Sequence, residues 1–169
     1  MRYVCLITCF IVSYNLFSFT FYSAVSNGDP NDLNNWSKTQ NGNGQRPADF
    51  TSGDLFIIKS GHQLTTTNAW NVTGTVQVEG TLTIQTANAI QILTISNGGI
   101  VYGNAQTTIT SSASGGQFNI NAGGKYIFNH ATINNATTLF NGTESFASTS
   151  TRLLNFRILK QPMVLLLVV

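Results

Sequence analysis

The clearest shortage in this 169-residue chain is of charged side chains, which make up 8% of it. Roughly a quarter of the residues in an ordinary soluble domain are charged. A charge content this low is typical of membrane proteins, low-complexity segments and repeat scaffolds. Disorder is disfavoured, because Val, Ile, Leu and Phe recur in short alternating runs through the middle of the chain and supply apolar surface to bury.

Long hydrophobic runs and basic clusters are scarce as well. After the first residues, no stretch approaches the roughly 20 continuous apolar residues that a spanning helix needs, so we expect no transmembrane segment there. Nucleic-acid binding depends on clustered Lys and Arg, so we expect no nucleic-acid partner. Between residues 20 and 151 the net charge is −2, from four cations and six acids: Lys38, Arg46, Lys59 and Lys125 against Asp29, Asp32, Asp49, Asp54, Glu79 and Glu144.

Cysteine occurs only near the start of the chain, at Cys5 and Cys9. There Arg2 precedes an apolar stretch over residues 3–12, and small residues follow between 18 and 26. This order predicts a signal peptide over residues 1–20, cleaved anywhere from about 18 to 26, and a secreted or cell-surface protein. The alternative is a buried N-terminal helix or strand of a cytosolic protein. A cleaved signal leaves a mature chain without cysteine, which therefore relies on stacking and hydrogen bonds rather than disulfides.

Glycine-punctuated alternation repeats through residues 54–151. Four segments (56–64, 76–84, 93–102 and 118–128) share alternating apolar residues around a marker glycine. The marker glycines lie 19, 19 and 25 residues apart, at Gly61, Gly80, Gly99 and Gly124. A near-constant period of this length predicts a solenoid. We therefore expect an all-β fold, a right-handed parallel β-helix of about four coils, with an antiparallel β-sandwich as the alternative.

Side-chain alternation assigns faces within each segment. In the second segment Val76, Val78, Leu82 and Ile84 share one face, because successive side chains of a strand point to opposite sides. We expect these apolar residues to form columns inside the stack, with Thr, Ser and Asn on the outside. The marker glycines are expected at the corners, where a side chain would clash.

Residues 21–53 differ in composition, with Ser, Asn, Asp and Gly around a lone tryptophan. We expect a first strand over residues 19–25 and then a loop-rich cap closing the end of the stack, with Trp36 as its plug and Asp54 at the junction with the first coil. The motifs that follow Trp36 are Gly44, Pro47, Gly53-Asp54, Ile57-Ile58, Gly61-His62 and Val76-x-Val78-x-Gly80-x-Leu82.

Over residues 21–150 this order resembles the opening of bacterial secreted, adhesin-like surface proteins and is similar to the eight-glycine domain of extracellular β-helix proteins. The resemblance implies a tryptophan-containing cap leading into a β-helix. It also implies a surface role in adhesion or in association with polysaccharide.

The sequence contains few residues that are candidates for catalysis or for metal binding. Acid–base or glycosidic catalysis needs paired carboxylates, and Glu79 is the only charged side chain between residues 60 and 124. Asp49 and Asp54 are close in sequence, but at a junction where turn hydrogen bonding accounts for Asp. His62 and His130 have no neighbouring third ligand, which a metal site needs. We therefore predict no catalytic residue, no metal site and no cofactor.

Two functions remain open. The first is a non-enzymatic structural or adhesive surface module, expected to be part of a larger secreted protein. The second is a carbohydrate-binding accessory domain of a polysaccharide-associated protein, in which Trp70, Tyr102 and Tyr126 share an exposed face and stack on sugar rings. Residues 152–169 depart from the repeat, with three cations and an aliphatic end. They are interpreted either as a last docking strand or as the product of truncation or a frame shift.

Overall fold

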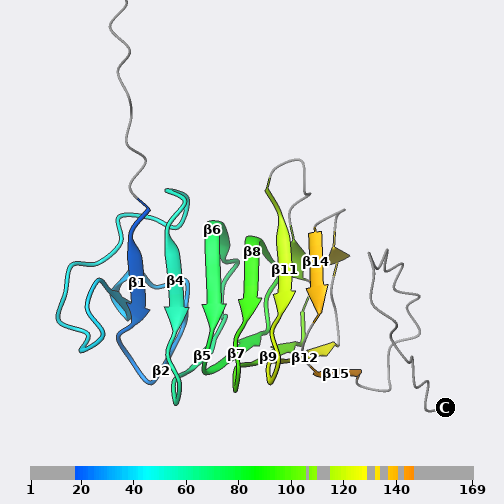
Figure 1. Ribbon diagram of the computed structural model, residues 1–169. Helices are drawn as coiled ribbons and strands as arrows, with labels where there is room; N and C mark the ends of the chain where they lie inside the picture. The colour runs from blue at the N-terminus through cyan, green and yellow to red at the C-terminus, as the bar shows by residue number, and fades with distance from the viewer. Residues whose placement is uncertain are drawn as a thin grey trace, which may run out of the picture.

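The computed structural model describes residues 18–105, 107–109, 115–128, 132–133, 137–140 and 143–146 (Figure 1). His130 and the segment 152–169 lie outside the described residues. The described elements are strands and one short 3-10 helix: β1 (Thr20–Ser23), β2 (Asn27–Gly28), η1 (Leu33–Asn35), β3 (Trp36–Ser37), β4 (Leu55–Ile58), β5 (Gln63–Thr65), β6 (Asn71–Val78), β7 (Thr81–Ile84), β8 (Asn88–Ile95), β9 (Ile100–Gly103), β10 (Thr107–Ile109), β11 (Gln117–Ile120), β12 (Lys125–Phe128), β13 (Thr132–Ile133), β14 (Thr137–Phe140) and β15 (Thr143–Phe146).

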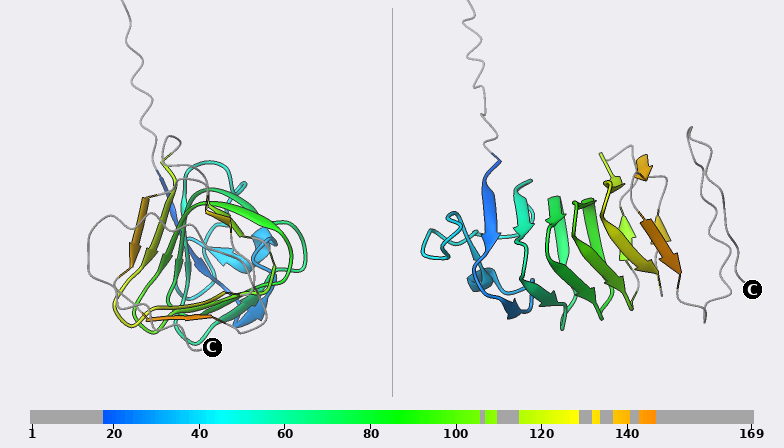
Figure 2. Two further views of the ribbon diagram at one scale, coloured as in Figure 1. Left: turned by 90° about the vertical axis from the view of Figure 1, so that its right-hand side faces the viewer. Right: turned by 60° about the horizontal axis from the view of Figure 1, so that its bottom comes forward.

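The chain alternates between two sheets as it advances. Sheet A places β1, β4, β6 and β8 side by side, followed by β10 with β13 and by β11 with β14. Sheet B runs β2, β5, β7, β9, β12, β15. Apart from the antiparallel contact of β1 with β3, these pairs are parallel. Viewed along the stack, successive turns of chain lie behind one another (Figure 2). The all-β fold with parallel strands that the alternation predicts is confirmed.

The register defines the length of each turn. On sheet A, Ile58 pairs with Val78, Val78 with Ile95, and β11 aligns Ile120 with Ile95, so the turns take 20, 17 and 25 residues. On sheet B the pairs Gln63–Thr81, Thr81–Ile100 and Ile100–Lys125 give 18, 19 and 25. The corner between the sheets shortens to two residues between Val78 and Thr81, which explains why the two sheets do not share one period.

The marker glycines belong to two columns rather than one. Gly80, Gly99 and Gly124 each precede an aligned residue of sheet B, and His62 holds the equivalent place in the first coil. Their role is close packing: a Cβ on Gly99 would overlap the carbonyl oxygen of Val78 in the coil below. Gly61 is instead a turn residue with a φ of 79°, in the left-handed region that favours glycine.

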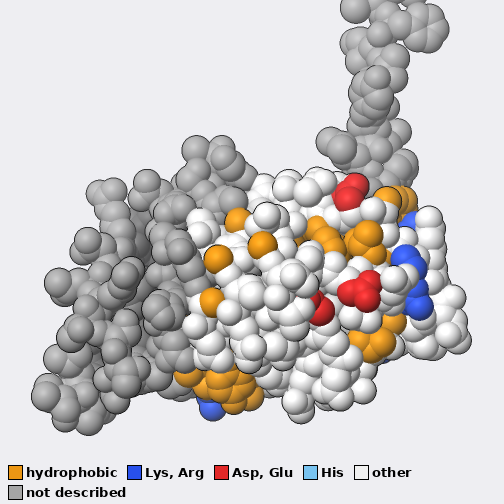
Figure 3. Space-filling model, turned by 180° about the vertical axis from the view of Figure 1, so that it is seen from behind, with side chains coloured by type: hydrophobic (Ala, Val, Ile, Leu, Met, Phe, Trp, Pro, Cys, Tyr) orange, Lys and Arg blue, Asp and Glu red, His pale blue; other side chains and the backbone are white. Residues whose placement is uncertain are grey.

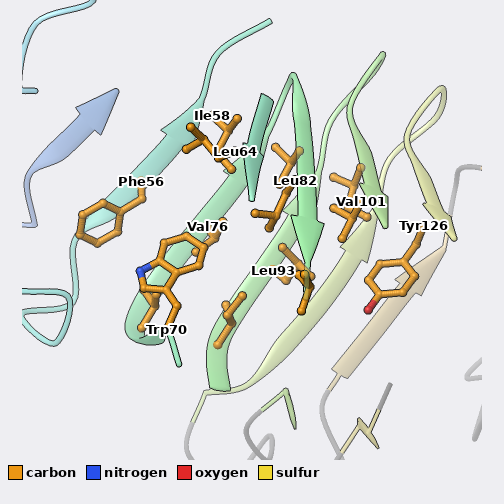
Figure 4. Close-up of a cluster of buried hydrophobic side chains, with 14 of the residues drawn as sticks. Phe56, Ile58, Leu64, Trp70, Val76, Leu82, Leu93, Val101 and Tyr126 are labelled. Carbon is orange, nitrogen blue, oxygen red and sulfur yellow. The ribbon is translucent and has the colours of Figure 1, made fainter. Parts of the chain in front are cut away.

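Apolar columns fill the space between the two sheets. The side chains that alternation assigns to the interior are buried, and they stack from one coil to the next (Figure 4). Burying continuous columns of this kind is the main stabilising contribution available to a chain in which 8% of the residues are charged. The columns are Phe56–Val76–Leu93–Phe118 and Ile58–Val78–Ile95–Ile120 from sheet A, and Leu64–Leu82–Val101–Tyr126 from sheet B.

A bulge bends sheet A. Val72 pairs with Ile90 but Thr75 pairs with Ile92, so one extra residue of β6 is inserted at Thr73–Gly74. Beyond the bend, the first part of β8 pairs with β10 and its second part pairs with β11. Bulges increase local twist and change strand direction. Each full turn of chain therefore has a third, short face in addition to the two main ones.

The N-terminal block closes one end of the stack. β1 pairs with β4, and Phe21 stacks on Phe56 with ring centroids 5.7 Å apart. Trp36 is fully buried, and its indole Nε1 donates to the carbonyl oxygen of Pro30 at 2.8 Å. It also lies 5.1 Å from Phe56 and 6.0 Å from Trp70, centroid to centroid.

Within the described residues no helix has the length and apolarity to span a membrane.

Candidate functional site

The three aromatic residues predicted to contact carbohydrate do not share an exposed face, and the prediction is wrong for two of them. Trp70 is fully buried against Trp36 and Phe50, and Tyr126 is 1% exposed. Only Tyr102, which is 36% exposed, presents a ring to solvent. Trp70 precedes β6 and points into the stack, where it covers the apolar end of the first coil (Figure 4).

Tyr126 is an interior residue because it lies in register with Val101. Its hydroxyl donates to the Thr107 hydroxyl at 3.3 Å, and its ring meets Phe118 edge to face. Burial away from water disfavours the phenolate and raises the pKa of Tyr126 to about 12, while the bond to Thr107 acts in the opposite direction. A side chain held in this way packs the core and cannot stack on a sugar.

The outer face of sheet B carries the exposed tyrosine. The second and fourth residues of each strand face in, so the outward positions on the two central coils of this face are Thr81, Thr83, Ile100 and Tyr102. The next strand continues the face with the exposed Lys125 and the half-buried Ile127. Seen from behind, hydrophobic side chains gather beside a basic one at the lower edge of the described surface (Figure 3).

The three carboxylates considered for catalysis are engaged separately. The Asp49 carboxylate accepts from the Thr51 amide at 2.7 Å and the Ser52 hydroxyl at 2.8 Å, and these bonds, that from Ser52 foremost, lower the pKa of Asp49. Asp54 is buried and accepts from the Phe19 amide at 2.7 Å, which ties β1 to the first coil. Glu79 accepts from the Gln77 side chain at 2.7 Å.

One serine–histidine contact lies at the junction of cap and coil. The Ser23 hydroxyl lies 2.9 Å from His62 Nδ1 and also accepts the Lys59 amide at 3.0 Å. Ser23 is completely buried, so it has no access to a substrate. Partial burial, and secondarily the positive charge of Lys59, lower the pKa of His62. The contact therefore joins β1 to the corner after β4, and its chemistry is that of a structural hydrogen bond.

Within the described ranges, no three His, Cys, Asp or Glu side chains are grouped closely enough to hold a metal ion. One carboxylate at the cap instead tethers two loops. Asp29 accepts through one oxygen from the Asn31 amide, and through the other from the amide and hydroxyl of Thr67. No sequence pattern predicts this tether, since 38 residues separate its partners.

The sequence is sufficient to predict that Tyr102 and Tyr126 lie on opposite faces of their strands. Tyr102 lies three residues after Gly99, whereas Tyr126 lies two residues after Gly124. Aligned glycines and a period of two therefore place these rings on opposite faces. No comparable pattern marks Trp70, which precedes its strand.

In comparisons with known proteins, no family model, curated protein or solved structure matches this chain.

Proposed function

We propose that this chain is an exported, non-enzymatic structural or adhesive module of a cell-surface protein, part of a larger secreted protein and built on a right-handed parallel β-helix. The observation that carries the proposal is the in-register stack of turns between sheets A and B. Its turns of 17 to 25 residues, together with the bend that gives each full turn a third face, support the β-helix. Crossovers between parallel strands are right-handed in about 98% of cases, which supports the hand.

A stack of this kind suits a surface module for a physical reason. Every coil buries its apolar side chains on its neighbours, so the rod gains length without disulfides and presents two extended faces. The outward positions carry hydroxyl and amide groups, such as Thr81, Thr83, Gln77 and Asn119, which interact with water or with the hydroxyl groups of a glycan coat.

Export is tested with the full chain expressed in a Gram-negative bacterium and followed by fractionation. We expect an exported form whose N-terminus lies close to residue 18, because β1 supplies the pairing of Thr20 with Leu55 and the stacking of Phe21 on Phe56. Cleavage near residue 26 would remove this strand. A Leu6→Glu variant, which breaks the apolar stretch, serves as the control and is expected to stay in the cytoplasm. Retention of the unaltered chain in the cytoplasm with Met1 intact would overturn the proposal.

The non-enzymatic part of the proposal has its own test. The purified chain is incubated with a panel of neutral and acidic polysaccharides, and reducing ends and unsaturated products are measured. We expect no product above the level of a heat-treated sample. Activity that disappears on substituting Asp49, Asp54 or Glu79 would establish an enzyme instead.

The second candidate function is a carbohydrate-binding accessory domain. One observation favours it: Tyr102 is exposed on the flat outer face of sheet B, beside columns of hydroxyl-bearing side chains. An exposed aromatic ring on a flat polar surface provides an apolar platform of the size of one sugar ring. The test is a glycan-array screen of the unaltered chain and of a Tyr102→Ala variant.

A further inference from the structure

The outer face of sheet B changes character halfway along the stack. On β5 and β7 the outward positions are polar, occupied by Gln63, Thr65, Thr81 and Thr83. On β9 and β12 the equivalent positions hold Ile100, Tyr102, Lys125 and Ile127, which we call the β9–β12 patch. Side chains alternate along each strand, and Val101 and Tyr126 fill the interior. These four neighbouring residues therefore lie on the outside. Apolar side chains grouped on a solvated face mark interaction sites.

The register brings the four side chains together. Tyr102 is paired with Ile127, and Ile100 is paired with Lys125. Adjacent strands lie about 4.8 Å apart and alternate residues of one strand about 6.6 Å apart, so the Lys125 and Tyr102 positions lie about 8 Å apart on the diagonal. An aromatic ring, two aliphatic side chains and one ammonium group thus form a single flat platform.

Charge distinguishes the ligands that this platform fits. Lys125 is the only charged residue among the outward positions of β5, β7, β9 and β12, and it is exposed. A ligand that covers the patch must therefore satisfy one positive charge and one aromatic face. The Thr and Gln columns of β5 and β7 continue the same face and offer hydrogen-bond donors and acceptors to a long, hydroxyl-rich ligand.

We propose that the β9–β12 patch binds an anionic polysaccharide, with a sugar ring stacked on Tyr102 and a carboxylate or sulfate of the same chain paired with Lys125. This inference rests on the second candidate function and specifies its ligand class. A folded protein partner fits less well, since stable protein interfaces bury about 800 Å² per partner and four side chains on a flat face supply far less apolar area. An extended glycan lying across the strands uses both the patch and the polar columns.

Affinity electrophoresis and titration calorimetry of the full chain test the proposal, with polygalacturonate and alginate as acidic probes and dextran as the neutral probe. We expect binding to an acidic probe that weakens with added salt, and none to dextran. Tyr102→Ala is expected to weaken binding about tenfold through loss of the stacking surface. Lys125→Gln is expected to weaken it about threefold and to remove most of the salt dependence.

Two control variants alter other parts of the surface. Lys59→Gln removes a cation at the cap junction, and Thr94→Ala alters the outward face of sheet A; both are expected to retain full affinity. Thermal melting followed by circular dichroism checks that each variant is folded. Failure to bind either acidic probe, or binding that neither patch variant weakens, overturns the inference. Binding to dextran alone, if it depends on Tyr102, would overturn the proposal that the ligand is anionic. The second candidate function, a carbohydrate-binding domain, would still stand. Neither result affects export, which is measured independently.

Discussion

At the scale of single residues, the corner glycines determine how closely coils approach. A Cβ on Gly99 would overlap the carbonyl oxygen of Val78 and lie 3.1 Å from the Ser96 carbonyl oxygen. Both neighbours are backbone atoms, so neither can move aside without shifting a coil. Gly98, the preceding residue, has open space around it and a φ of 79°.

Gly99→Ala is therefore expected to lower the free energy of unfolding by about 2 kcal/mol, because the overlap forces two coils apart. Gly98→Ala is the control and is expected to cost about 1 kcal/mol, from backbone strain alone. Urea unfolding followed by tryptophan fluorescence measures both. An equal or smaller loss for Gly99→Ala would contradict the two-column assignment.

The buried amide of Asn88, by contrast, lowers the free energy of unfolding. Both polar atoms of the Asn88 side chain are buried and lack a hydrogen-bond partner. Asn88→Val is expected to raise the free energy of unfolding by about 1 kcal/mol, because it removes a desolvated polar group and adds apolar contact.

The matched control for this substitution is Asn71→Val, at an exposed position of the preceding coil, where we expect a change within about 0.5 kcal/mol. Chemical denaturation of the three chains under one set of conditions provides the comparison. A loss of stability in Asn88→Val would show that the amide is hydrogen-bonded in solution.

At the scale of elements, the junction of β1 with the corner after β4 responds to pH. His62 contacts Ser23 there, with Lys59 close by, and its pKa is lowered from 6.5. A folded-state pKa below the unfolded value means that the unfolded chain binds protons more readily as pH falls. The contribution of neutral His62 to stability is therefore complete above about pH 6.5 and declines as pH falls below that value.

His62→Asn removes this titration while keeping a polar group near Ser23. Between about pH 7.5 and about pH 5 we expect the urea midpoint of the unaltered chain to fall further than that of the variant. His130 is present in both chains, so the difference between them isolates His62. Equal declines in the two midpoints would contradict the assignment.

At the scale of the whole molecule, the cap protects one end of a stack that otherwise exposes strand edges and apolar columns. Trp36 lies at the centre of this packing, fully buried against Phe56 and Trp70. Trp36→Ala is expected to cost about 3–5 kcal/mol and to promote association through the uncovered edge. Trp36→Phe keeps most of the packing but loses the bond to Pro30, so we expect a cost of about 1 kcal/mol and no association.

Light scattering at two protein concentrations, together with urea unfolding, separates the two effects of Trp36. Cap packing predicts that only the alanine variant gains mass with concentration. A Trp36→Ala chain that remains as stable and as monodisperse as the unaltered one would rule out the plug.

Sequence patterns alone predict the strand content, the inward and outward alternation within each repeat, and a cap around Trp36. These properties are local: a period of two and a change in composition are visible in any short window. The spacing from the marker glycines, which places Tyr102 and Tyr126 on opposite faces, is also present in the sequence. The tertiary structure alone decided which glycines stack, because a corner of two residues before Thr81 replaces the corner of four before Gln63 and shifts the alignment.

Only the tertiary structure buried Trp70, tied Asp29 to Thr67 and gathered Ile100, Tyr102, Lys125 and Ile127 on one face. Each of these relations joins residues in different coils. Their distance in space is set by hydrogen bonds between coils, which select the register that aligns the apolar columns, and no short stretch of sequence specifies that register.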